Sequence, residues 1–546
     1  MMTMEERMSR TGSLVAVGMA LTVAVVAGII TLGSGVLFPD APSPLRVTSP
    51  SLLFASSADV RLAVDQAQGP VTWSVSSRSG TVVDSGTTAD MSTDVIVPKV
   101  PAPGLYSFSL DDGRGALAGT LLVTGVMPTT ADPFFSVATH WGKQTFASST
   151  WPLATTVPLV TGLGFRQIRD ETTWTSVERT AGAFTIPDFA SELASAAQQN
   201  DLRMLFVASY GNPRAYPGDM DGPMTPPTTD EGRAAFVQYI NSVLDANPGI
   251  DKVEVWNEFN RPRRNTSDCQ SGACYATLVR AVYEGVKAAH PDVKIVAGNT
   301  HGIPFDWFAD FMNAGGLKYV DYLSTHGYAS DIADLRNGIR RLDALARSHN
   351  GGKSVPIIVS EVGLTNTTTT PPLGNVSRVL NEDQAAAGLA KIFVTMKSLP
   401  AVAQTVWYDA LNDGSDPTET EANFGLYRQP TPQISAFQPK PAAASMATLV
   451  RQLDGYTFTS VASPAGDVTA YTFTDASGEE RRVMWRNAPF ASTDESTTSV
   501  RITTPTGRVT NVRSVTGDVV RVLTAGTATI EVGNEPVYID EGVARG

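Results

Sequence analysis

The sequence has little cysteine and histidine, with two Cys and five His among 546 residues. Two cysteines cannot build a disulfide scaffold, and they are too few for a structural zinc site. Positive charge is not in excess either, because 41 Lys plus Arg stand against 54 Asp plus Glu and the net charge is -13. Such a chain repels phosphate backbones and, more weakly, other anionic polymers. We therefore expect a globular protein that needs no metal, no organic cofactor and no nucleic acid.

Charge is missing altogether between Arg10 and Asp40, and the segment 14–32 is almost wholly apolar. As a helix with a rise of about 1.5 Å per residue, it is long enough to span a hydrocarbon core of roughly 30 Å. Arg7 and Arg10 precede it and orient the N-terminus inward. We expect a cytoplasmic tail (1–10) and a transmembrane signal anchor (11–39), with the remaining chain outside the cell. The alternative is a signal peptide that is cleaved, which leaves a secreted protein.

The two cysteines, Cys269 and Cys274, enclose the short segment QSGA. Its Gly and Ser allow the chain to turn back and bring the two Cα atoms within disulfide distance. In an exported domain, a local disulfide is the expected pairing.

The spacing of apolar residues along the sequence divides the rest of the chain into three parts. Short β-type runs separated by turn signals predict a β-sandwich-like module over 40–128 and a second β-sandwich over 456–546. Between them, at 129–455, apolar strands alternate with helical segments, which predicts a (β/α)8 TIM barrel of the α/β class. An open doubly wound sheet is the alternative, but no Gly-rich dinucleotide motif follows the first strand. The eight expected strands cover 134–142, 165–174, 202–211, 252–260, 293–300, 319–329, 356–364 and 403–411.

Two glutamates close apolar strands in this barrel. Glu258 follows KVEVWN on the fourth strand, and Glu361 follows PIIVS on the seventh. Active residues of such barrels sit at the carboxyl ends of the strands, so the two carboxylates should meet across one pocket. Paired carboxylates suit the cleavage of glycosidic bonds, because one protonates the leaving oxygen while the other attacks the anomeric centre. The alternative is an ion pair that closes the barrel mouth.

Here the sequence resembles a known clan. WNEFN (256–260) and IIVSEVG (357–363) are similar to the acid/base and nucleophile signatures of clan A glycoside hydrolases, the 4/7 retaining barrels, and the layout is most similar to family 39. The resemblance covers about 130–546. It implies that Glu258 is the general acid/base and that Glu361 is the nucleophile. The sequence departs from the family at Phe259, where proline is frequent.

The resemblance also implies supporting residues. Asn257 would bind the sugar 2-hydroxyl, Arg169 would keep the nucleophile ionised, and Trp407 would be the aromatic floor under a sugar ring. His326 and Tyr328, in STHGY (324–328), would position the carboxylates. From their places at the ends of the first and third strands, we add three pocket candidates, which are His140, Trp141 and Tyr210. Core packing is the alternative for the ring residues, and pairing with Asp170 or Glu171 is the alternative for Arg169.

The expected activity is hydrolysis of O-glycosidic bonds in an extracellular polysaccharide or glycoconjugate, with retention in two steps. Retaining enzymes hold their carboxyl groups about 5–5.5 Å apart, whereas a separation of about 9 Å would indicate inversion. Two alternatives remain open at this level. One is a non-catalytic glycan-binding envelope protein, and the other is a transglycosylase on the same barrel.

Overall fold

The computed structural model describes residues 45–88, 94–128, 132–143, 151–368, 379–504, 506, 508–524 and 526–544. The predicted cytoplasmic tail and signal anchor lie outside these residues. None of the helices in the described part of the chain has the length and apolar character that crossing a bilayer requires.

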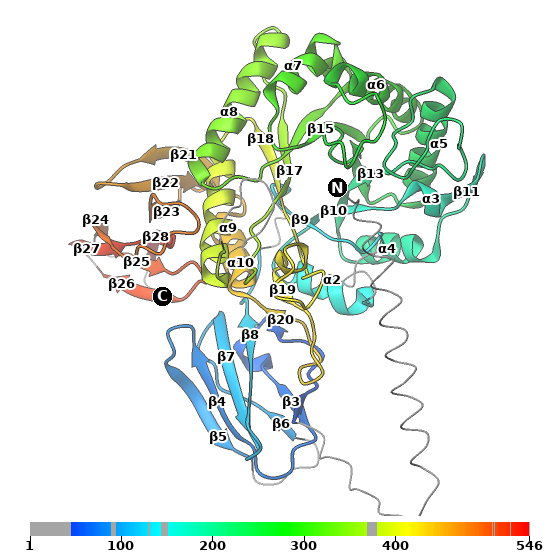
Figure 1. Ribbon diagram of the computed structural model, residues 1–546. Helices are drawn as coiled ribbons and strands as arrows, with labels where there is room; N and C mark the ends of the chain where they lie inside the picture. Colours follow the sequence, from blue (N-terminus) through cyan, green and yellow to red (C-terminus); the bar gives the residue numbers. More distant parts are fainter. Residues whose placement is uncertain are drawn as a thin grey trace, which may run out of the picture. The chain divides into compact units, whose positions relative to one another are not determined.

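Eight parallel strands form a closed barrel, which confirms the predicted fold and excludes the open sheet (Figure 1). Their order around the barrel follows the chain, and β18 returns to β9 with Thr405 opposite Phe135. All eight expected strands are present, although most are shorter than predicted. They are β9 (Phe135–Ala138), β10 (Gln167–Glu171), β13 (Arg203–Ala208), β14 (Ile250–Val255), β15 (Lys294–His301), β16 (Tyr322–His326), β17 (Ile357–Val362) and β18 (Val402–Trp407).

A helix follows each barrel strand, and the helices surround the strands (Figure 1). Local signals define several helix starts: Thr229 caps α5, Asn381 and Gln384 form a capping box on α9, and Pro441 occupies the first turn of α10. The helices are α2 (Leu153–Thr161), α4 (Asp188–Gln199), α5 (Asp230–Ala246), α6 (Gly272–Ala289), α7 (Phe305–Asn313), α8 (Ile332–His349), α9 (Glu382–Lys397) and α10 (Pro441–Leu453).

Shorter elements lie in the loops of the barrel. The loop after β10 contains α3 (Trp174–Val177), β11 (Glu178–Thr180) and β12 (Ala183–Phe184), and η3 (Gly316–Tyr319) precedes β16. The segment between β18 and α10 contains η4 (Glu421–Asn423), β19 (Tyr427–Arg428) and β20 (Gln438–Pro439).

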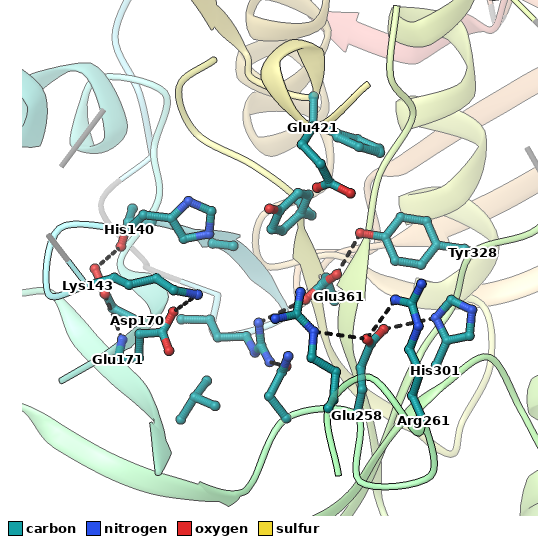
Figure 2. Close-up of a pocket in the computed structure, with 18 of the residues that line it drawn as sticks. His140, Lys143, Asp170, Glu171, Glu258, Arg261, His301, Tyr328, Glu361 and Glu421 are labelled. Atoms are coloured by element: carbon teal, nitrogen blue, oxygen red, sulfur yellow. Dashed lines mark hydrogen bonds and ion pairs between the residues drawn. The ribbon is translucent and has the colours of Figure 1, made fainter. Parts of the chain in front are cut away.

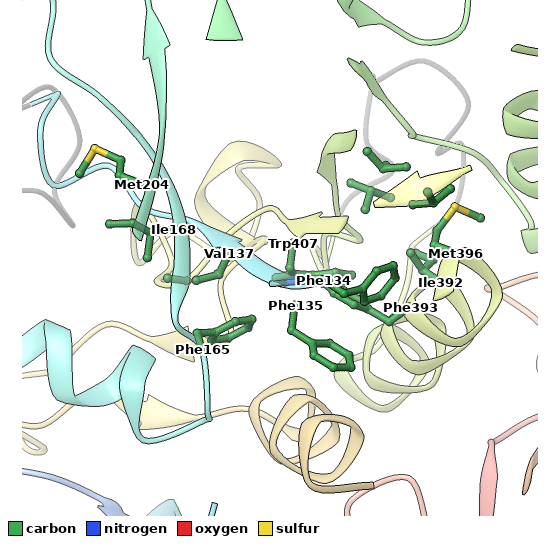
Figure 3. Close-up of a cluster of buried hydrophobic side chains, with 14 of the residues drawn as sticks. Phe134, Phe135, Val137, Phe165, Ile168, Met204, Ile392, Phe393, Met396 and Trp407 are labelled. Carbon is green, nitrogen blue, oxygen red and sulfur yellow. The ribbon is translucent and has the colours of Figure 1, made fainter. Parts of the chain in front are cut away.

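The outer faces of the strands pack against the helices in a large apolar core (Figure 3). Phe135 of β9 stacks on Phe393 of α9 with ring centroids 6.1 Å apart, and Phe134 meets Phe135 edge to face. Replacing a buried ring of this kind by alanine costs about 3–5 kcal/mol. This core therefore fixes the strands whose ends carry the polar residues described below.

The barrel interior is layered by polarity. Leu205, Val296, Ile358 and Val406 form an apolar layer. Charged residues of β10 and β14 also point inward, because Arg169 reaches Glu254 across the intervening strand β13. Strand residues alternate in direction, and the neighbours Ile168, Val253 and Val255 belong to the apolar core around the strands instead.

The N-terminal module consists of two sheets around a separate apolar core, which includes Val64, Val75, Phe108 and Leu121. One sheet has the order β2-β8-β7-β4-β5 and the other β1-β3-β6, which confirms a sandwich-like module. Its elements are β1 (Arg46–Val47), β2 (Leu53–Phe54), η1 (Ser57–Asp59), β3 (Leu62–Asp65), β4 (Thr72–Ser77), β5 (Val82–Thr87), β6 (Asp94–Ile96), β7 (Gly104–Asp111) and β8 (Ala116–Val123).

The C-terminal module is also built from antiparallel strands, with a third core around Met484, Val500, Ile502 and Ile530. A six-stranded sheet, β21-β22-β23-β28-β25-β26, accompanies the pair β24-β27. The expected flanking β modules are thus both present, while the exact borders near residues 128 and 455 stay predictions. The strands are β21 (Thr457–Ala462), β22 (Val468–Thr474), β23 (Glu480–Arg486), β24 (Thr498–Thr504), β25 (Arg508–Arg513), β26 (Val519–Leu523), β27 (Gly526–Val532) and β28 (Val537–Ala544).

The predicted disulfide is confirmed. Cys269 and Cys274 are bonded, with Cα atoms 5.5 Å apart. The bond closes a short loop at the start of α6, on the same connection that carries Glu258.

Candidate active site

Glu258 lies in a tight turn after β14, not in the strand itself as predicted. The strand ends at Val255, and Trp256 and Glu258 both have a positive φ, of 68° and 54°. This conformation is rare for residues with large side chains and is concentrated at functional sites. Asn299 of β15 holds the turn from both sides, since its carbonyl accepts from the Glu258 N–H (2.9 Å) and its side-chain amide donates to the Trp256 carbonyl.

The carboxylate of Glu258 is buried and surrounded by donors. Its Oε1 lies 2.9 Å from His301 Nδ1 and 3.2 Å from His326 Nδ1. Its Oε2 accepts from Arg261 Nη1 at 3.1 Å, and Arg264 Nε is 3.8 Å away. Burial favours the neutral acid, but the hydrogen bonds and charges of His301 and His326 outweigh it and lower the pKa of Glu258 far below its usual range. In the free protein, Glu258 is therefore a carboxylate.

The carboxylate of Glu361 projects from β17 into the same space. Its Oε1 accepts from the Tyr328 hydroxyl at 2.7 Å, and its Oε2 accepts from Arg169 Nη1 at 3.1 Å. Burial and the neighbouring Glu361 raise the pKa of Tyr328 well above its ordinary value, so the phenol keeps its proton. Glu361 is thus held by one neutral and one charged donor.

Arg169 links the barrel interior to this site. Its Nε donates to Glu254 Oε2 (2.8 Å) and its Nη2 to Asn257 Oδ1 (3.0 Å), in addition to the bond to Glu361. Burial opposes the charge of Arg169, but Glu254 and Glu361 raise its pKa above the usual value. The guanidinium thus stays charged and fixes Asn257 beside Glu361. The alternative partners are engaged elsewhere: Asp170 accepts from Thr139, and Glu171 pairs with Lys143.

One imidazole joins the two glutamates. His326 Nδ1 is 3.2 Å from Glu258 Oε1 and 3.6 Å from Glu361 Oε1. Because both distances meet at one nitrogen, these two oxygens are at most 6.8 Å apart. Glu258 and Glu361 therefore face each other at close range.

The two carboxylates line a cavity of about 470 Å³ at the barrel mouth (Figure 2). Of the ten residues expected in the site, the cavity wall contains His140, Arg169, Tyr210, Asn257, Glu258, Tyr328 and Glu361. Asn257 also donates to the Tyr210 hydroxyl at 3.2 Å, which connects the two sugar-binding candidates.

The other three expected residues lie behind the wall. His326 is fully buried and reaches the carboxylates only through Nδ1. Trp141 is buried in the core, and its backbone N–H donates to Asp170. Trp407 has an exposed fraction of 0% and packs in the apolar core, which corrects the expectation of an aromatic floor under the sugar (Figure 3). Tyr408, the next residue, lines the cavity instead.

Among the described residues, one group has the spacing of metal ligands. Ligand atoms of His140, Asp409 and Asp413 lie within 4.8 Å of one another. Burial and the neighbouring Asp413 raise the pKa of Asp409 well above its ordinary value. His140 Nδ1 forms a hydrogen bond of 3.2 Å with Asp413 Oδ1 and lies 3.9 Å from Asp409 Oδ2, so this hydrogen bond and a retained proton on Asp409 account for the group. We assign no ion to it.

Several residues of the site were not anticipated from the sequence, namely Lys143, Glu171, Glu254, Arg261, Arg264, His301 and Glu421. His301 had a usable signal, because it directly follows the apolar fifth strand VKIVAGNT. Glu254 also had one, as a charged residue inside an apolar strand. Glu421 and Lys143 lie in loops, where no sequence period indicates direction.

With this geometry established, the comparisons with known proteins become informative. Residues 227–464 match the family described as glycosyl hydrolase catalytic core. This segment contains both Glu258 and Glu361, and it extends from α5 into the C-terminal module. No curated protein matches the chain.

Solved structures show the same fold. A family 39 glycoside hydrolase from Bacteroides cellulosilyticus WH2 is 21% identical, with a TM-score of 0.74, over 91% of this chain and 100% of that one. A family 39 enzyme from Xanthomonas axonopodis pv. citri and a monomeric beta-xylosidase from Caulobacter crescentus CB15 are each 15% identical, with a TM-score of 0.51, over 76% of this chain and 95% and 97% of theirs. The predicted resemblance to clan A and family 39 is thus confirmed as a likeness of fold.

Proposed function

We propose that this protein is a retaining glycoside hydrolase, with Glu361 as the nucleophile and Glu258 as the general acid/base. The observation that carries the proposal is the shared contact with His326, which limits the closest oxygens of the two carboxylates to 6.8 Å. Retention needs carboxyl groups about 5–5.5 Å apart, whereas inversion needs about 6.5–9.5 Å to admit a water between sugar and base. The limit of 6.8 Å admits the retaining spacing and leaves out only the wider part of the inverting range. The match of residues 227–464 to a glycosyl hydrolase catalytic core supports the same reaction class.

Each contact has a use in such a reaction. Glu361 attacks the anomeric carbon while Glu258 gives its proton to the departing glycosidic oxygen, which leaves a glycosyl ester on Glu361. Glu258 then takes a proton from water as the water attacks the same carbon and releases Glu361. Arg169 and Tyr328 orient the nucleophile, and Asn257 lies where it can bind a hydroxyl next to the reacting carbon.

The substrate that we propose is a polysaccharide or glycoconjugate outside the cell. The apolar segment 14–32 supports export. The Cys269–Cys274 disulfide supports it too, since disulfides persist in oxidising compartments. Protease treatment of intact cells should digest the barrel, and protection of the barrel until lysis would contradict this location.

The activity is tested with the full-length protein in detergent against aryl glycosides and cell-envelope glycans, with products identified by mass spectrometry. We expect hydrolysis by the wild type and its loss in Glu361→Ala, while Glu284→Ala, at an exposed position on α6, serves as the matched control. Unchanged hydrolysis by Glu361→Ala would exclude the proposal, and glycan binding without product would indicate a binding protein. Products longer than the substrate would identify a transglycosylase.

The stereochemistry is tested with azide. Glu258→Ala should form a glycosyl azide with the configuration of the substrate, because azide replaces water in the second step. Glu361→Ala should form one of opposite configuration, because azide then attacks directly. The reverse assignment would exchange the roles of the two glutamates.

A further inference from the structure

The segment RPRR (261–264) follows Glu258, and the fold turns two of its three arginines, Arg261 and Arg264, toward the cavity. Arg261 Nη1 donates to Glu258 Oε2 at 3.1 Å, and Arg264 Nε lies 3.8 Å from the same oxygen. Both line the cavity wall, with 28% and 37% of their side chains exposed. Figure 2 shows Arg261 beside Glu258 with its guanidinium group in the cavity.

These arginines carry more charge than their partner neutralises. Within the described part of the chain, Glu258 is the only carboxylate within 4.0 Å of either guanidinium group. That carboxylate already accepts hydrogen bonds from His301 and His326 on its other oxygen. Arg264 also donates to the Tyr210 hydroxyl at 3.4 Å, which still leaves several of its five N–H donors unused by these acceptors. The region beside Oε2 is therefore cationic and rich in donors.

The position of this region relates it to the leaving group. An acid/base carboxyl must approach the glycosidic oxygen, so the groups around it border the departing sugar. Arg169 and Tyr328 bind the nucleophile, whereas Arg261 and Arg264 contact only the acid/base of the pair. They therefore border the leaving-group side of the scissile bond.

We propose that Arg261 and Arg264 bind an anionic substituent, a carboxylate or a sulfate ester, on the leaving-group part of the substrate. The proposal rests on the function proposed above, and it assigns acidic glycans as the substrate class. Guanidinium groups match the paired oxygens of both anions, and charge-assisted hydrogen bonds are roughly twice as strong as neutral ones.

The net charge of -13 does not oppose this site. Charges farther than a Debye length of about 8 Å are largely screened at physiological ionic strength, so the groups beside the substrate dominate its binding. Lys143 lies over the ring of Tyr210, 5.5 Å from its centroid, and adds a further cationic group on this wall, although Glu171 pairs with it.

Matched substrates isolate the charge of the leaving group. Aryl glycosides of a sugar that the full-length protein hydrolyses are made with a 3-carboxyphenyl group, a 3-sulfophenyl group and the neutral methyl ester of the former. We expect kcat/KM of the wild type to be about tenfold higher for an anionic leaving group than for the ester. A preference for carboxylate over sulfonate, or the reverse, identifies which anion the site accepts.

Variants then assign the preference to the two arginines. In the double variant Arg261→Gln, Arg264→Gln, kcat/KM should be equal for charged and neutral substrates. Arg263→Gln, at an exposed position in the same loop, should keep the wild-type preference. If the substitutions act only through Glu258, they lower kcat/KM for charged and neutral substrates by the same factor, and the ratio of the two values stays unchanged. Equal kcat/KM for all three substrates in the wild type, or an unchanged ratio in the double variant, overturns the proposal while hydrolysis itself stands.

A binding measurement covers the case in which no glycoside is hydrolysed, which would refute the proposed function. Oligogalacturonate, a carrageenan oligosaccharide and neutral cellotetraose are titrated calorimetrically into the full-length wild type and the double variant. Tighter binding of either anionic probe, weakened about tenfold in the double variant, supports the anionic site. No binding of either anionic probe, or binding that the substitutions leave unchanged, overturns it.

Discussion

Glu258 and Glu361 are joined through a single nitrogen, His326 Nδ1, at 3.2 and 3.6 Å. His326 is fully buried, and its Nε2 has no hydrogen-bond partner among the described residues. The hydrogen bond to Glu258 Oε1 therefore places a proton on Nδ1, and Glu361 Oε1 lies just beyond hydrogen-bond distance of the same nitrogen. The histidine thus sets the spacing of the two glutamates without touching the cavity.

Replacement of His326 by glutamine should lower kcat about 100-fold with a smaller change in KM, because misplacement of a catalytic group by about 1 Å has an effect of this size. His349→Gln, at the exposed end of α8, is the control. Steady-state kinetics on the best aryl glycoside provide the measurement. A His326→Gln variant that retains the wild-type kcat would show that the glutamates are positioned by other contacts.

Arg169→Met should destabilise the fold by about 3–5 kcal/mol, because it leaves the buried carboxylate of Glu254 and the partly buried carboxylate of Glu361 without their shared counter-charge. Urea unfolding measures the change in the free energy of unfolding. Arg280→Met, which removes the exposed pair with Glu284 on α6, should have little effect. Equal effects of the two substitutions would show that the buried network contributes no more than a surface pair.

Activity should depend on pH through Glu258. Burial raises the pKa of this carboxyl, but His301 and His326 lower it by more, so the net shift is downward. Arg261 and Arg264 also face the carboxyl group. The first chemical step needs the protonated acid, so kcat/KM should rise as the pH falls from about 7 to about 5. His301→Ala removes a donor to the carboxylate, raises the pKa of Glu258 and should move the alkaline limb to higher pH. An alkaline limb that stays in place would contradict this account.

The same shift affects stability in a defined direction. A carboxyl whose pKa is lower in the folded state stabilises the fold above its unfolded pKa of about 4.5, and this contribution is lost as the pH falls. As the pH falls from neutral, the wild type should therefore lose more of its free energy of unfolding than Glu258→Gln does, each compared with its own value at neutral pH. A parallel shift of the two curves would contradict the linkage.

The disulfide should contribute modestly to stability and little to chemistry. Cys269 and Cys274 close a very short loop, for which the chain-entropy model gives about 2 kcal/mol. The double variant Cys269→Ser, Cys274→Ser should lose about this much stability while kcat stays near the wild-type value, because the bond lies beyond the turn that holds Glu258. A large loss of kcat would show that the disulfide also fixes the loop that carries Arg261 and Arg264.

The sequence by itself determined the fold class and the central pair of residues. Eight apolar strands alternate with helices in the central part of the chain. This hydrophobic pattern is a local property of the sequence, so a barrel with flanking β modules could be predicted from it. Glu258 and Glu361 could be predicted from the sequence, because a charged residue at the carboxyl end of a buried barrel strand faces the mouth of the barrel. Glycine, serine and a four-residue spacing likewise predicted the disulfide.

The tertiary structure decided which neighbours these residues have. Trp407 looked like a sugar platform, yet side-chain direction at a strand end depends on the local turn, and the fold places its ring in the core. Arg261, Arg264 and His301 converge on Glu258 only because a loop with positive φ angles folds back over β15. No period in the chain encodes such a convergence, since it depends on the backbone angles of an irregular loop and, for His301, on contact with a separate strand.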